Sequence, residues 1–156
     1  MKKTPVFKTG YVILKEKHLI IEVFDGALNL ENYKSHRLTQ SLDVDFSPNY
    51  NLFVDLRLVT VTGTLQDVKA YVDYVIEIGN RIGRRNTAIL VSTPNQKIYA
   101  HELSQLKGLL HDLKIFTHME PAVKWVSNDI SVKEVEEIIL KLRKNPPFVF
   151  YSDSEF

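Results

Sequence analysis

Short apolar runs typical of β-strands alternate along this sequence with segments that have the spacing of amphipathic helices. The clearest strands are predicted at Asn51–Leu56 and Thr87–Ser92. Between them, apolar residues recur on one helical face, at Leu65, Val68, Val72, Val75, Ile76 and Ile82. Because strands that alternate with helices favour parallel pairing, we expect a mixed, mostly parallel sheet of about five strands with helices on its faces.

The first quarter of the chain predicts a β-hairpin. Tyr11–Leu14 and Leu19–Phe24 are rich in β-branched and apolar residues, and a polar stretch separates them. We expect Asp25–Gly26 to close this unit. Asn29 is then placed to cap a helix that runs to about Leu42, with apolar positions at Leu30, Tyr33, Leu38 and Leu42.

The second half of the chain continues the alternation. Tyr99, Leu103, Leu106 and Leu110 recur at helical spacing, and a last strand is predicted at Leu113–Thr117. Glu120–Pro121 opens a short helix, and Ser131 to Glu134 matches a capping box at the start of a final helix, 131–144. The tail, 145–156, carries four aromatic residues, so we expect it to dock on the body or on a second subunit.

Composition limits the kinds of partner and chemistry. The 156 residues include 20 basic and 19 acidic ones, which gives no argument for nucleic acid or an anionic membrane as a partner. The absence of cysteine excludes disulfides, thiolate nucleophiles and cysteine metal sites. No signal core or membrane span is recognisable, so the expected location is the cytoplasm. We expect a single domain, 1–156, with its core at about 8–127.

Four local features resemble the STAS superfamily, and within it the SpoIIAA-like branch. They are Phe24-Asp25-Gly26, Tyr33 in the first predicted helix, Phe53-Val54-Asp55-Leu56, and Ala122-Val123-Lys124-Trp125-Val126. The superfamily has the fold of bacterial anti-sigma-factor antagonists. The resemblance therefore implies a bacterial, non-enzymatic regulatory domain that binds a protein partner.

In phospho-regulated members of this superfamily, the strand ending in Asp-Leu leads to an Asp-Ser-x-Gly-like turn at the start of the next helix. A partner kinase phosphorylates the serine, and the interaction is switched off. This chain keeps Asp55, Leu56 and Gly63 but lacks the Asp-Ser pair. Thr62 and Thr64 are the nearby hydroxyls that could replace the serine, which leaves the phosphorylation switch an open question.

The stretch from Thr60 to Thr64 is the best candidate for a site. A helix N-terminus has unpaired N–H groups and a partial positive charge, so it can hold an anion or respond to phosphorylation. Arg57 could add a charge, and Asp55 follows a buried strand at the edge where α/β sheets place ligands. The alternative is that Thr64 simply caps the helix and Gly63 permits a tight turn.

No motif of a catalytic, metal or cofactor site is present. His101-Glu102 is not followed by the second histidine of a zinc-protease motif, because position 105 is Gln. Gly79–Gly83 lacks the spacing of a dinucleotide-binding loop, and neither a Walker A sequence nor a Gly-x-Ser-x-Gly elbow occurs. Arg81, Arg84 and Arg85 are expected at the last turn of a helix, solvated or facing an acidic partner.

Two functions from different classes therefore stay open. The leading hypothesis is a non-enzymatic interaction domain that binds a protein through Thr62-Gly63-Thr64 and the helix that follows. The alternative is a binder of a small apolar or amphiphilic ligand, which requires a cavity of several hundred Å³. An enzyme of unknown type is the third and least favoured option.

Overall fold

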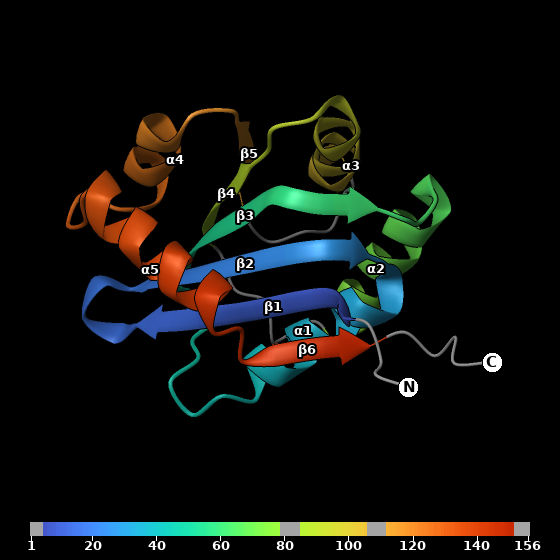
Figure 1. The fold of residues 1–156 in the computed structure, drawn as a ribbon, viewed down its shortest axis with the longest axis horizontal. Helices are drawn as coiled ribbons and strands as arrows, with labels where there is room; N and C mark the ends of the chain where they lie inside the picture. Colours follow the sequence, from blue (N-terminus) through green and yellow to red (C-terminus); the bar gives the residue numbers. More distant parts are fainter. Residues whose placement is uncertain (1–4, 79–84, 106–111, 152–156) are drawn as a thin grey trace.

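The computed structural model describes residues 5–78, 85–105 and 112–151, which form one six-stranded sheet (Figure 1). The strand order is β5-β4-β3-β2-β1-β6. Strands β2 to β5 are parallel to one another, whereas β1 is antiparallel to both β2 and β6. The strands are β1 Pro5–Leu14, β2 Leu19–Leu28, β3 Asn51–Val61, β4 Asn86–Leu90, β5 Asp112–Phe116 and β6 Phe148–Tyr151.

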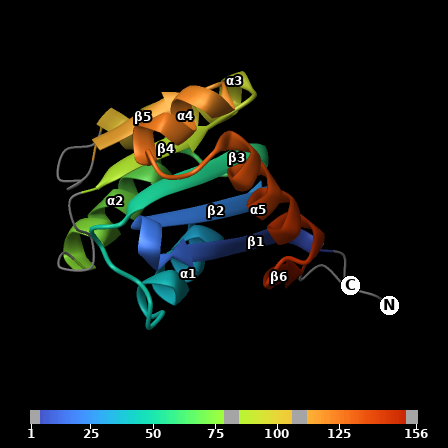
Figure 2. The same ribbon diagram turned by 90° about the vertical axis from the view of Figure 1, so that its left-hand side faces the viewer.

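Helices cover both faces of the sheet, as Figure 2 shows from the side. One face, called here the α1–α3 face, packs against α1 Leu30–Ser41, α2 Leu65–Ile78 and α3 Pro94–Gln105. The other, called the α4–α5 face, packs against α4 Met119–Val126 and α5 Val132–Lys144. The predicted α/β class, the order of elements and the extra C-terminal helix are confirmed.

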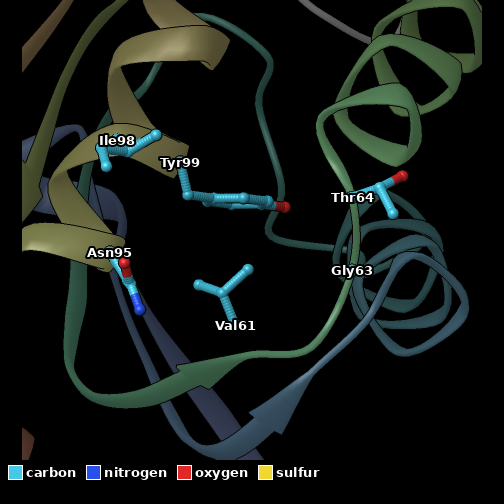
Figure 3. A pocket seen from close by; sticks show the side chains of 6 residues that line it. All are labelled: Val61, Gly63, Thr64, Asn95, Ile98 and Tyr99. Atoms are coloured by element: carbon cyan, nitrogen blue, oxygen red, sulfur yellow. The ribbon is translucent and has the colours of Figure 1, made fainter.

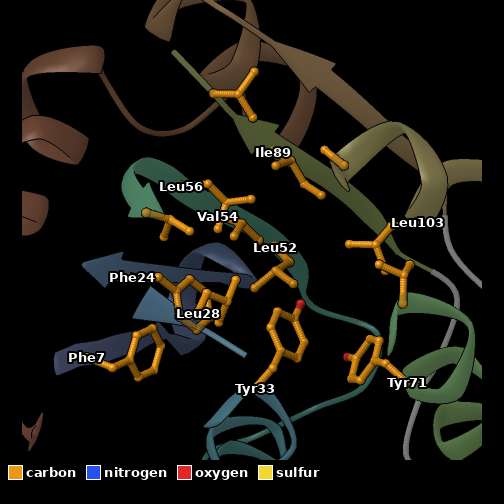
Figure 4. Packing of buried hydrophobic residues seen from close by; sticks show 14 of the residues in the cluster. Phe7, Phe24, Leu28, Tyr33, Leu52, Val54, Leu56, Tyr71, Ile89 and Leu103 are labelled. Carbon is orange, nitrogen blue, oxygen red and sulfur yellow. The ribbon is translucent and has the colours of Figure 1, made fainter. Parts of the chain in front are cut away.

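Each face of the sheet has its own apolar core because side chains alternate along the strands. Phe24, Leu52, Val54 and Leu56 lie in the cluster on the α1–α3 face (Figure 4). Their neighbours in the chain, among them Val23 and Phe53, lie in the cluster on the α4–α5 face. The nearly continuous apolar runs of β2 and β3 are thus explained by burial on both sides.

The hairpin differs from its prediction at Gly26. A 3-10 turn, η1 Lys15–Lys17, joins β1 to β2, and β2 continues through Asp25–Gly26 to Leu28 instead of ending there. Gly26 has φ +96°, and a Cβ at this position would lie 2.4 Å from the carbonyl oxygen of Val6. Glycine therefore lets β1 pass this close to β2 without ending the strand. The register with β3 shifts just before it, between Val23 and Asp25, where β3 carries one more residue than β2 and forms the bulge.

Strand β3 is also longer than predicted. It extends past Leu56 to Val61, because its pairing with β2 resumes after the bulge, from Leu58 to Val61. Thr60, which we predicted in a turn, is thus a strand residue.

The predicted number of strands was too low by one. The tail forms β6, which pairs with β1 over Pro5–Thr9, so this part of the tail docks on the body. Residues 152–156 lie outside the described part of the chain.

The predicted caps of two helices are confirmed. Asn29 accepts a hydrogen bond from Asn32 N, and Ser131 and Glu134 form the expected capping box. The inward face of α1, however, was predicted correctly only at Leu30 and Tyr33. Leu38 and Leu42 are exposed, whereas His36, Arg37 and Gln40 are buried beside Tyr33.

The segments that follow α2 and α3, 79–84 and 106–111, are not described. The predicted positions Ile82, Arg81, Arg84, Leu106 and Leu110 fall outside the described residues. Arg85 does not lie in a helix; it precedes β4 and is buried, which corrects its expected placement at a solvated helix end. Across the described ranges, no helix is long and apolar enough to cross a bilayer.

Candidate functional site

A pocket of about 310 Å³ lies where the C-terminal end of β3 meets the first turns of α2 and α3 (Figure 3). Its lining residues are Val61, Gly63, Thr64, Asn95, Ile98 and Tyr99. The carboxyl ends of parallel strands are where α/β folds bind ligands. Two of the predicted site residues, Gly63 and Thr64, therefore border a real cavity.

The lining of the pocket mixes polar and apolar groups. The ring of Tyr99 lies near Val61, and its hydroxyl points toward the strand that leads into α2 (Figure 3). Burial, with smaller effects of Tyr33 and Asp67, raises the pKa of Tyr99 above its ordinary value, so the phenol is neutral. Ile98 stands at the rim with 53% of its surface exposed. The polar groups expose more of the lining than the apolar ones, so the pocket suits a group that has both polar and apolar parts.

The turn that borders the pocket is fixed by a reciprocal cap. Thr64 Oγ1 accepts a hydrogen bond from Asp67 N at 3.3 Å, and Thr64 N donates to Asp67 Oδ2 at 2.8 Å. Both the amide and the hydroxyl of Thr62 donate to Leu28 O, at 3.1 and 3.0 Å. The capping role foreseen for Thr64 is confirmed, and the turn has a defined shape before anything binds.

Gln96, which sequence reasoning missed, holds the opposite wall of the pocket. Its Nε2 donates to the carbonyl oxygens of Arg57 and Val59, at 3.1 and 2.8 Å. Its Oε1 accepts from the amides of Ser92 and Thr93, at 2.8 and 3.1 Å. One buried amide thus ties the end of β3 to the start of α3.

Asp55 and Arg57 lie elsewhere, on the α4–α5 side of β3. The Asp55 carboxylate is buried and accepts hydrogen bonds from Arg57 Nε and Nη2, each at 3.0 Å, and from Arg143 Nη2 of α5 at 2.6 Å. The bonds to Asp55 raise the pKa of Arg57. The structure therefore separates Gly63 and Thr64 at the pocket from Asp55 and Arg57, which belong to an ionic tie that fastens α5 to the sheet. Thr62 lies in the turn beside the pocket and bonds to Leu28 O.

A second polar cluster, also missed, lies under α1. The carboxylate of Glu22 is fully buried and accepts hydrogen bonds from Arg37 Nη2, His36 Nε2 and Gln40 Nε2, at 2.8, 2.9 and 2.6 Å. Burial alone would raise the pKa of Glu22, but Arg37 and His36 outweigh it and hold that pKa well below its usual range. Thr9 completes the cluster by contacting His36 Nδ1 at 2.9 Å while donating to Val23 O. An acidic residue within the apolar run Ile20–Phe24 was the one sequence signal of this cluster.

Arg85 adds a buried cation without an adequate partner. Only 7% of its surface is exposed, and its Nε and Nη1 have no hydrogen-bond partner within the described part of the chain. Burial, reinforced by the charge of Arg37, lowers the pKa of Arg85 to about 10. Over the same ranges, no three His, Asp or Glu side chains gather closely enough to hold a metal ion.

Comparison with known proteins bears on the fold. No family model matches the sequence, and no curated protein matches it. A solved structure does: the crystal structure of an uncharacterized protein from the DUF3478 family with a SpoIIAA-like fold, from Shewanella loihica PV-4. It superposes with a TM-score of 0.52 at 15% identity and covers 81% of this chain and 98% of that one.

The chain has a SpoIIAA-like fold. This result confirms the fold expected from the Phe24–Gly26, Tyr33, Phe53–Leu56 and Ala122–Val126 features. In this SpoIIAA-like fold the pocket opens at the end of β3, next to the turn in which the sequence placed the site.

Proposed function

We propose that this SpoIIAA-like domain is a non-enzymatic, cytoplasmic interaction module whose partner protein contacts the Thr62–Thr64 turn, the first turns of α2 and α3, and the pocket between them. The observation that carries the proposal is the pocket of about 310 Å³ beside that turn. Exposed Ile98 at its rim offers an apolar contact, and interfaces place such contacts around a pocket filled by the partner.

The turn also gives a route for control by phosphorylation, with Thr62 and Thr64 as the proposed acceptors. A phosphate on Thr64 would lie beside the Asp67 carboxylate, which accepts a hydrogen bond from Thr64 N. Because like charges repel, the phosphorylated turn would open and partner binding would weaken. Phosphopeptide mapping of the protein isolated from its cell tests whether either threonine is modified.

Site-specific photocrosslinking tests the proposed surface. A photoreactive phenylalanine analogue replaces Ile98 in one variant and Leu140, an exposed residue of α5 on the opposite face, in the other. We expect one defined cross-linked protein with the Ile98 variant and none with the Leu140 variant, and Thr64→Glu should abolish that product. The same products from both positions, or none from Ile98, would contradict the proposal.

A second candidate function, binding of a small amphiphilic ligand, is favoured by the same pocket, since its volume reaches the lower end of the range for ligand sites, about 300–1,000 Å³. Ile98→Trp should fill the pocket while leaving the fold intact. Native mass spectrometry of the protein isolated from its cell should then show a bound small molecule in the original chain and none in the variant. A wild-type mass that equals the bare chain would remove this candidate.

A further inference from the structure

Strand β6 ends the sheet on the side of β1, and only one of its edges is paired. Phe148, Val149 and Phe150 are in register with Thr9, Lys8 and Phe7 of β1. Within the described residues, no strand pairs with the outer edge of β6. An unpaired strand edge exposes a row of N–H and C=O groups that another strand can satisfy.

The side chains of β6 divide between the two faces of the sheet. Phe150 packs on Phe7 with ring centroids 5.6 Å apart, and Phe148 stacks on Tyr11 at 6.2 Å. Because neighbours alternate, Val149 and Tyr151 lie on the α4–α5 face, where Tyr151 is half exposed. In Figure 1, α5 crosses this face and reaches β6 at its beginning, so the part of the strand near Tyr151 is not covered by a helix.

The two outer strands of the sheet differ in their protection. Natural edge strands usually carry charges or proline that discourage pairing with other chains. Strand β5 carries the charged residues Asp112 and Lys114. If β5 paired in antiparallel fashion with β5 of a second copy over its full length, Lys114 would lie opposite its own copy, and the two ammonium groups would repel each other. Strand β6, with the sequence Phe-Val-Phe-Tyr, contains no charge, glycine or proline.

We infer that β6 pairs in antiparallel fashion with β6 of a second copy of this chain, so that two six-stranded sheets join across a twofold axis. Directly opposite residues of an antiparallel pair point to the same face of the sheet, so one residue of β6 must lie opposite its own copy, at the twofold axis. The two four-residue strands overlap most when that residue is Val149 or Phe150. In the first register Phe148 meets Phe150 of the copy; in the second Val149 meets Tyr151 of the copy. Both set uncharged aromatic or β-branched side chains opposite each other, as stable cross-strand pairs require.

This interface is separate from the pocket, because β1 and β2 lie between β6 and β3. The inference goes beyond the proposed function and does not depend on it. Loss of the partner protein would leave the pairing of two copies unaffected, and a monomeric chain could still use its pocket.

Sedimentation equilibrium of the full chain tests the inference with two edge variants. In Val149→Glu the new carboxylate lies opposite Lys8 of β1, so it forms a pair of opposite charges within the monomer. In a dimer of the first register, however, the carboxylates of the two copies face and repel each other across the twofold axis. Tyr151→Glu changes an exposed side chain and disturbs the second register. Thr60→Glu, at the exposed end of β3, is the matched control, and circular dichroism checks that each variant is folded.

We expect the original chain and Thr60→Glu to dimerise between about 1 and 300 μM, and the variant that disturbs the register in use, Val149→Glu for the first or Tyr151→Glu for the second, to bind itself at least about tenfold more weakly. If Val149→Glu fails to fold, Val149→Cys replaces it: the chain has no cysteine, so in the first register mild oxidation should join two copies by a disulfide. A chain that stays monomeric throughout this range would overturn the inference, as would a dimer that both folded edge variants retain.

Discussion

Oε1 of Glu22 lies 2.8 Å from Nη2 of Arg37, at a place where both side chains are withdrawn from solvent between β2 and α1. This pair explains why α1 turns a polar face toward the sheet. Both charges lose hydration on folding, and hydrogen bonds from His36 and Gln40 complete the compensation at the carboxylate. Such a cluster tolerates the removal of one member poorly.

Glu22→Gln should destabilise the protein strongly. The substitution keeps the size of the side chain but removes the negative charge that faces Arg37, so the buried guanidinium remains uncompensated. We expect a loss of about 3–5 kcal/mol in the free energy of unfolding, measured by urea denaturation.

Glu120→Gln is the matched control for this loss. Glu120 pairs with Lys124 on α4, where both side chains are largely exposed. We expect a change of less than about 0.5 kcal/mol, as is usual for an exposed i,i+4 pair. Equal effects of the two substitutions would show that the Glu22 cluster is not a buried, coupled unit.

Acid should weaken the protein through Glu22. Its folded-state pKa is depressed below the unfolded value of about 4.3, so its stabilising contribution is complete above that value. As the pH falls below it, the unfolded chain binds a proton that the folded chain resists, and the contribution is lost. The stability of the original chain should therefore fall more steeply from pH 5 to pH 2.5 than that of Glu22→Gln, measured by urea midpoints. Parallel profiles would exclude Glu22 as the cause.

Arg85→Met should raise stability. Two nitrogens of the buried guanidinium have no hydrogen-bond partner among the described residues, and a pKa lowered to about 10 means that its charged form is disfavoured on folding. This cost is fully present below pH 10 and disappears only as the pH rises toward the unfolded value. We expect a gain of about 1–2 kcal/mol at pH 7 in urea denaturation, because methionine fills similar space without a charge. Lys124→Met, on an exposed side chain, serves as control, and a loss of stability in Arg85→Met would mean that Arg85 is compensated in solution.

Gln96→Glu should distinguish the hydrogen bonds that Gln96 donates from those that it accepts. A carboxylate can still accept from the amides of Ser92 and Thr93, but it would face the carbonyl oxygens of Arg57 and Val59 without a proton to donate. We expect a loss of about 2–3 kcal/mol in the free energy of unfolding at pH 7, because the carboxylate oxygens then face the carbonyl oxygens of Arg57 and Val59 and all of these atoms are acceptors. Protonation restores one donor, so the loss measured by thermal unfolding should be smaller at pH 4. A loss that does not depend on pH would contradict this account of the site.

Local patterns in the sequence were sufficient for most of the fold. The caps at Asn29 and Ser131, the apolar runs of β2 and β3, and the alternation of elements depend on neighbouring residues, and all were predicted correctly. The continuation of β2 past Gly26 depended instead on how closely β1 approaches that glycine, and β6 depended on a free edge of β1. Neither condition is visible in a single stretch of sequence.

The candidate site shows the same limit. Gly63 and Thr64 were found because a helix start has a local signature, and the pocket confirmed that they border a cavity. Gln96 and Arg143 were missed, since each acts on residues more than thirty positions away in the chain. Asp55 was selected for its place at a strand end, but the direction of its side chain, toward α5, is set by the pleat of β3.

Gly26 and Gly63 should respond very differently to alanine. At Gly26 the new Cβ would lie 2.4 Å from the backbone oxygen of Val6, and φ is +96°, so neither the strand nor the residue can adapt cheaply. At Gly63 it would lie 2.7 Å from Oδ2 of Asp67, the far end of a side chain that can rotate away at the expense of its bond to Thr64 N. We expect Gly26→Ala to cost at least about 2 kcal/mol and Gly63→Ala about 1 kcal/mol or less in urea denaturation, in line with backbone strain against the loss of one exposed cap. The reverse order would show that the close approach of β1 to Gly26 relaxes in solution and that the capped turn at Thr64 is the more rigid of the two.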